Sequence, residues 1–199
     1  MPPPPKSLRE RQKQFARVQL LEAAERRFNE KGFAETSIEE ILEAAGVSRA
    51  TLYAYFTGKE GLLFAIAEQT FDDAQRQYEG FATLPEWTLP SIEKWLRDTA
   101  SERIEFGPRY KSVLVSGRGF LSSPAGLDRT DGLIKAVLTR STGWAHLDSD
   151  EAHVRARMLV VLVEQQFYDL ILRDDPLDPL DALDQFVRFT ARAVILLLS

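Results

Sequence analysis

The chain contains no cysteine among its 199 residues. That absence excludes disulfide bonds, thiolate metal sites and a cysteine nucleophile. Long apolar runs are also missing, since the one at the C-terminus, Ala193–Leu198, is far shorter than the ~20 residues that span a bilayer. The N-terminus begins with Met1, four prolines and a charged run, so it lacks the apolar core of a signal peptide. We therefore expect a soluble, cytoplasmic protein.

Signatures of catalysis are absent as well. The sequence has no GxSxG, Walker A or GxGxxG motif, and the glycines at 117 and 119 lack the strand context that would give them meaning. Carboxylates are numerous, but no recognised spacing pairs them. These absences predict that the protein is not an enzyme and uses no cofactor.

Charge is unevenly distributed, although the net charge is only −5. Residues 1–60 hold ten basic and nine acidic residues, whereas residues 61–199 hold fifteen and twenty-one. Lys6, Arg9, Arg11 and Lys13 lie near the start and are opposed only by Glu10. Taken alone, this run fits a solvated tail equally well. A basic arm and a near-neutral head ahead of an acidic body also suit DNA binding.

Helical periodicity dominates the chain, and no alternating strand pattern appears. The pattern predicts an all-α protein of about nine helices. Glycine, proline and capping residues set the helix ends. The expected helices cover about 9–31, 37–45, 49–55, 59–78, 91–106, 109–120, 125–141, 149–173 and 179 onward.

The most informative segment is 36–60, which reads TSIEEILEAAGVSRATLYAYFTGKE. Two short helices joined at a tight glycine turn form a helix-turn-helix unit. Gly46 permits the left-handed backbone of that turn. Ser48 caps the second helix, whose outer face then carries Arg49 and its neighbours. Such side chains can enter a DNA major groove.

Residues 15–64 resemble the DNA-binding domain of the TetR/AcrR family of bacterial regulators. The similarity lies in the Ala24-x3-Phe28 helix ending, then Lys31-Gly32-Phe33, Thr36-Ser37-Ile38, and the run from Ile41 to Ser48. It continues through 51–56 and 59–63. The resemblance implies a flexible basic arm over 1–13, a three-helix DNA-binding domain over 14–64, and a ligand-binding and dimerisation domain over 65–199.

The resemblance also implies DNA-contacting residues. Arg49, Ala50 and Thr51 are the expected base readers, and Lys59 a phosphate contact. On pattern alone, at least one of Tyr53 and Tyr55 would more often pack in the core. Ser48 is expected to act first as a helix cap. The predicted set is Thr36, Ser37, Ser48, Arg49, Ala50, Thr51, Tyr53, Tyr55 and Lys59.

For the body, the resemblance implies a pocket between the middle helices and a four-helix bundle between two copies. The last two helices are apolar on more than one stripe, which agrees with dimerisation, although a monomeric core is the alternative. The pocket candidates are Trp95, Phe106, Tyr110, Phe120, Trp144, Gln165 and Tyr168. The dimer-interface candidates are Val161, Phe167, Phe186 and Val194.

Together these features predict a repressor that binds a palindromic operator on double-stranded DNA as a homodimer and is released by a small, largely apolar effector. Two alternatives keep the DNA-binding head and change the body. The body could bind a protein partner, which a large exposed apolar patch would favour. It could also sense a metal through His146 and His153 near three acidic residues, although no recognised ligand spacing is present.

Overall fold

The computed structural model describes residues 8–105, 107–116, 124–140, 144, 146–172 and 179–198. Across these residues the chain forms nine helices and no strand, which confirms the all-α prediction. The helices are α1 (Leu8–Glu35), α2 (Ile38–Ala45), α3 (Arg49–Tyr53), α4 (Lys59–Ala82), α5 (Leu89–Glu105), α6 (Gly107–Ser116), α8 (Pro124–Arg140), α9 (Ser149–Leu172) and α10 (Pro179–Leu198).

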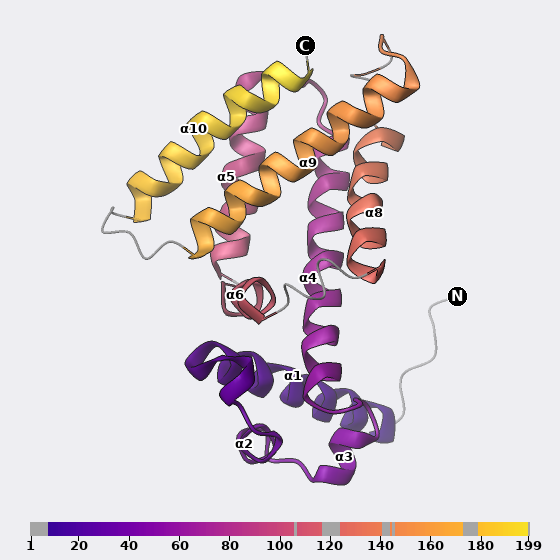
Figure 1. Cartoon of the computed structure of the whole chain (residues 1–199), viewed down its shortest axis with the longest axis vertical. Helices are drawn as coiled ribbons and strands as arrows, with labels where there is room; N and C mark the ends of the chain where they lie inside the picture. The colour runs from indigo at the N-terminus through magenta and orange to yellow at the C-terminus, as the bar shows by residue number, and fades with distance from the viewer. Residues whose placement is uncertain are drawn as a thin grey trace.

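The first three helices and the start of α4 form a small head at one end of the molecule (Figure 1). Its core gathers the apolar faces of all four helices, with Leu20, Ile41, Leu52 and Leu62 fully buried. Gly32 interrupts α1 with a φ of 85°, which an L side chain rarely adopts, so the chain turns here toward α2. The helices α2 and α3 are too short to be stable in isolation, so their packing against this core stabilises them.

Helix α4 runs from the head into the body without a break (Figure 1). Its first turns belong to the head core, through Leu62, Leu63 and Ile66. Its later turns belong to a second core, through Ala74 and Tyr78. The domain boundary expected near residue 64 therefore falls inside a helix, and the apolar stripe of α4 passes from one core to the other.

The body is built around the second half of α4, with α8 packed along it and α9 crossing the front (Figure 1). Helix α10 packs on α9 and α5. The core between them is rich in aromatic contacts, such as Phe81 against Trp95 with centroids 4.9 Å apart. The short helix α6 lies between head and body and packs on both α1 and α4.

The N-terminal arm differs from the expectation. Helix α1 begins at Leu8, so residues 8–13 are helical rather than an extended arm. Residues 1–7, including Lys6, lie outside the described residues. The last proline of the N-terminal run is Pro5, so every residue from Leu8 onward in this segment has a backbone N–H that can donate a helical hydrogen bond. Among the described helices, none is long and apolar enough to cross a membrane.

Candidate functional site

The helix-turn-helix unit has the local geometry that its sequence predicts. Ser37 caps α2 by accepting from the Glu40 backbone N–H, and the Glu40 carboxylate accepts from the Ser37 N–H at 2.8 Å. Gly46 lies in the left-handed region, with φ 63° and ψ 32°, and ends α2. Ser48 then caps α3 by accepting from the Thr51 N–H at 3.1 Å. Each helix end is therefore set by a contact three residues away.

Helix α3 lies at the end of the head that points away from the body (Figure 1). Ser48, Arg49 and Ala50 are exposed, and Tyr53 is 52% exposed. An ion pair with Glu39 of α2 holds the Arg49 guanidinium. Because both partners are exposed, this pair is weak and can be exchanged for a stronger one. The exposed face of α3 thus offers one positive charge, one aromatic phenol and small side chains.

Three other predicted DNA contacts are partly covered. Thr51 and Tyr55 are half-buried, and the Tyr55 ring contacts Phe56 in the head core. The Ser37 hydroxyl is half-buried and donates to the Glu40 carboxylate. The pattern-based expectation that one of the two tyrosines packs on the core fits Tyr55.

Thr36 and Lys59 have hydrogen-bond partners inside the head. Thr36 is 2% exposed, and its hydroxyl donates to the Gly32 carbonyl at 2.7 Å. The Lys59 ammonium donates to the carbonyls of Phe33, Ala34 and Thr36 at 2.7 to 3.3 Å. Carbonyls left over at the end of α1 attract a cation. Both side chains therefore close the end of α1, a role that sequence spacing did not reveal.

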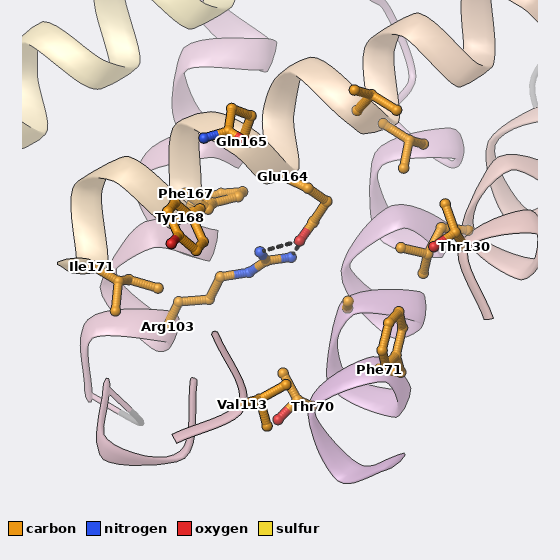
Figure 2. Close-up of a pocket in the computed structure, with 14 residues that line it drawn as sticks. Thr70, Phe71, Arg103, Val113, Thr130, Glu164, Gln165, Phe167, Tyr168 and Ile171 are labelled. Atoms are coloured by element: carbon orange, nitrogen blue, oxygen red, sulfur yellow. Dashed lines mark hydrogen bonds and ion pairs between the residues drawn. The ribbon is translucent and has the colours of Figure 1, made fainter. Parts of the chain in front are cut away.

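A cavity of about 370 Å³ lies in the body between α4, α5, α6, α8 and α9 (Figure 2). Most of its wall is apolar, with a few polar groups on facing helices. Its lining residues are Thr70, Phe71, Ala74, Arg103, Val113, Thr130, Leu133, Val160, Val161, Glu164, Gln165, Phe167, Tyr168 and Ile171.

An ion pair between α5 and α9 crosses this cavity wall (Figure 2). The Arg103 guanidinium donates to both carboxylate oxygens of Glu164, at 2.8 and 2.9 Å. The Arg103 Nε donates to the Gln77 Oε1 at 2.9 Å, and the guanidinium carbon Cζ lies 4.0 Å from the centre of the Phe167 ring. Burial raises the pKa of Tyr78 well above its usual range, and the negative charge of Glu164 adds to the shift.

The structure brings together only some of the predicted pocket residues. Gln165 and Tyr168 line the cavity. Trp95 and Trp144 lie in the body core instead, where Trp95 packs on Tyr78 and Phe81, and Trp144 contacts Trp87. Phe106, Phe120 and the Tyr110 side chain lie outside the described residues. Aromatic content marks both core and pocket, so composition alone could not separate them.

The predicted dimer residues are mostly internal. Phe167, Phe186 and Val194 are buried in the core of this chain, with Phe167 and Phe186 rings 4.9 Å apart. Val161 is 54% exposed and also lines the cavity. The exposed apolar residues of the last two helices are Val154, Met158, Val161, Phe189 and Leu196. The sequence showed that these helices are apolar on more than one stripe, but it did not show which stripe faces the core of the chain.

Helix α6 connects the cavity to the head. Val113 lines the cavity and is also buried in the head core. Arg109 forms ion pairs with Glu25 of α1 at 3.2 Å and Asp73 of α4 at 3.1 Å. Burial raises the pKa of Glu25, and Arg109 acts against that shift. Helix α6 therefore contacts the cavity, α1 and α4 at once.

The candidate metal ligands have ordinary surroundings. His146 and His153 are exposed, and the Asp148 carboxylate accepts from the N–H groups of Asp150 and Glu151 at the start of α9. Across the described ranges, no group of three histidine or acidic residues is arranged to hold a metal ion.

The family profile for bacterial regulatory proteins of the tetR family matches residues 20–66, from α1 through the helix-turn-helix unit into α4. The head of this chain is therefore a DNA-binding domain of the tetR family. The TetR-family match is confined to the head. The proteins matched by name are transcriptional regulators and not enzymes, in agreement with the prediction from sequence.

Relatives of known name agree with this assignment. The chain is 38% identical over 74 residues to the transcriptional repressor ComR of Escherichia coli, covering 37% of this chain and 35% of ComR. It is 39% identical over 69 residues to the regulator TtgR of Pseudomonas putida, covering 33% of each. The aligned segment thus spans about a third of the length of these relatives.

Solved structures share the whole fold. GusR of Salmonella enterica superposes with a TM-score of 0.70 at 19% identity, covering 92% of this chain and 95% of GusR. A TetR-family regulator of Pectobacterium atrosepticum superposes with a TM-score of 0.63 at 22% identity, covering 97% and 96%. At such identities the likeness establishes the fold of the body alone.

Proposed function

We propose that this chain is a sequence-specific repressor that binds a palindromic operator on cytoplasmic DNA as a homodimer and is released by a small, largely apolar molecule. The observation that carries the proposal is the exposed face of α3 with Arg49, Ala50 and Tyr53 on a capped helix-turn-helix unit. Arginine can bind guanine through two hydrogen bonds, and alanine fits against a thymine methyl group.

Dimerisation is supported by the exposed stripe on α9. Val154, Met158 and Val161 lie three and four residues apart, so they share one face of the helix. Phe189 and Leu196 add a similar pair, seven residues apart, on α10. Two such helices from each copy would bury these side chains. A two-fold dimer would place two recognition helices in successive major grooves, about 34 Å apart.

Release by a small molecule is supported by the cavity and by α6. A cavity that is mostly apolar with a few polar groups is typical of small-molecule sites. Val113 joins that cavity to the head core, so a ligand can favour a body conformation whose head spacing no longer fits the operator. A cavity of this kind favours a small molecule over the alternative of a protein partner.

The test uses the purified full chain, DNA selected from random duplexes, and mobility shifts at two salt concentrations. Arg49→Ala should lose about tenfold or more of the discrimination between operator and mutated operator. Arg97→Ala is the matched control, because Arg97 is also an exposed arginine in an ion pair, with Asp184 of the body. Unchanged discrimination in Arg49→Ala would refute the role given to α3.

A further inference from the structure

The polar groups of the cavity differ in what they can still offer a ligand. The hydroxyls of Thr70 and Thr130 each donate at 3.0 Å to a backbone carbonyl four residues earlier in their own helix. Their remaining capacity is to accept. Gln165 already donates to the Asp169 carboxylate at 3.0 Å, and Tyr168 is uncharged. None of these four groups carries a positive charge that would attract an anion.

The two charged groups of the wall are unequally accessible. The Arg103 side chain is 2% exposed, whereas that of Glu164 is 36% exposed. The guanidinium is covered by Phe167 on one face and is bonded to Gln77 and Glu164. A carboxylate has about four acceptor positions; the guanidinium fork occupies two of them, and the Tyr78 hydroxyl also faces this carboxylate. Figure 2 shows both members of the pair at the cavity, and the more exposed of the two charges is the negative charge of Glu164.

An anionic ligand would meet this carboxylate before it could reach Arg103. To bind, it would have to displace Glu164 or lie beside it, and two carboxylates in one site repel each other. A cation can instead bind at the exposed part of the Glu164 carboxylate and leave the Arg103 pair intact. The rings of Phe71 and Tyr168 also line the cavity, and aromatic faces attract cations.

We propose that this cavity selects an amphipathic cation, with an aromatic or branched aliphatic body and one protonated amine or amidine that donates to Glu164. The inference rests on the proposed ligand-responsive function and specifies its effector class. The cavity of about 370 Å³ admits a body of two fused rings. The threonine hydroxyls accept additional N–H bonds from the same ligand.

The first experiment compares three probes that share one ring system, by calorimetric titration into the full chain at pH 7. The probes are 1-naphthylmethylamine, which is cationic, 1-naphthalenemethanol, which is neutral, and 1-naphthylacetate, which is anionic. The amine should bind roughly tenfold or more tightly than the alcohol, as for a hydrogen bond to a charged group. The acetate should bind weakest. This comparison requires no variant.

Variants then test whether Glu164 is the group that binds the amine. Glu164→Gln keeps the size of the side chain and should remove most of the preference for the amine over the alcohol. Thr130→Val should weaken the amine a few-fold and is independent of the Arg103 pair. Glu105→Gln is the matched control, because Glu105 is an exposed acid on α5 outside the cavity. A preference that survives in Glu164→Gln, tighter binding of the acetate, or no binding of the amine to the folded wild type would each overturn the proposal.

A mobility shift with the same protein separates this inference from the proposed function. Operator binding without any probe tests the DNA-binding role alone. If the chain binds its operator but not the amine, the effector class is wrong and the DNA-binding role stands. If the amine binds selectively and does not release the operator, the cavity assignment stands and the release step of the proposed function is wrong.

Discussion

The head and the body use polar side chains in different ways. In the head, the defining contacts are local: Ser37 with Glu40, and Ser48 with Thr51, each three residues apart. In the body, the Arg103–Glu164 pair joins residues 61 positions apart, and the Tyr78 hydroxyl donates to the Val160 carbonyl 82 positions away. Local contacts specify helix ends, whereas distant contacts specify how finished helices meet. The two regions should therefore respond differently to loss of a polar group.

The largest effect is expected where a distant pair is buried. Arg103→Met leaves Glu164 without its partner and should lower the free energy of unfolding by about 3 kcal/mol, the lower end of values for a broken buried pair, because Glu164 is partly exposed. Denaturant unfolding measures this change. Arg97→Met, on the same helix, breaks an exposed pair with Asp184 and should cost no more than about 1 kcal/mol.

A double variant sharpens this result. Arg103→Met with Glu164→Leu removes both charges and should recover most of the lost stability, since an apolar pair can replace a buried ion pair. Equal losses in Arg103→Met and Arg97→Met would mean that the distant pair does not hold the body together more firmly than a surface contact does.

Lys59 is the exception in the head, because its contacts reach back 23 to 26 positions. Lys59→Met should lower stability by about 2 kcal/mol by removing a charged donor from three carbonyls. The salt dependence of operator binding should stay unchanged, because the ammonium is held by the fold. Lys31→Met, which breaks an exposed pair with Glu40, is the control. A salt slope reduced by about one would instead identify Lys59 as a phosphate contact.

A local cap should matter less. Ser48→Ala removes the N-cap of α3 and should cost about 1 kcal/mol. Ser101→Ala changes an exposed serine inside α5, whose hydroxyl donates to the Arg97 carbonyl, and should stay within about 0.5 kcal/mol of the wild type. If the two substitutions cost the same, the capping bond seen at α3 contributes nothing to stability.

The smallest effect is expected from the charge of Glu40, which forms the reciprocal cap with Ser37 at the start of α2. Hydrogen bonds from Lys31 and Ser37 lower the pKa of Glu40 from 4.5 to about 2. The ionised form therefore stabilises the head above pH 4.5, and this contribution is lost as the pH falls toward 2. The stability gap between wild type and Glu40→Gln should narrow over that range in denaturant titrations. A gap as wide at pH 2 as at pH 7 would contradict this assignment.

The same contrast explains what could be predicted from sequence. Both ends of α2, the start of α3, Gly46 and the cap Ser48 were predicted, because each depends on residues within one turn, whereas α3 ends at Tyr53 and not at the predicted Tyr55. The Arg103–Glu164 pair left no sequence signal, because nothing at either position indicates the other. Thr36 and Lys59 were assigned to DNA, yet their partners lie at the end of α1. Which of two apolar stripes faces inward, as at Phe167, likewise depends on the assembled fold.

The unbroken course of α4 has a geometric consequence. Its 24 residues form a rod about 36 Å long that is anchored in the body at one end and carries the head at the other. Tilting such a rod by roughly 5° displaces its far end by about 3 Å. In the proposed dimer the two rods are related by the two-fold axis, so opposite tilts would change the distance between the two recognition helices by up to about 6 Å, measured against a groove repeat of about 34 Å. The proposed release from DNA therefore requires only a small tilt of α4 within the body.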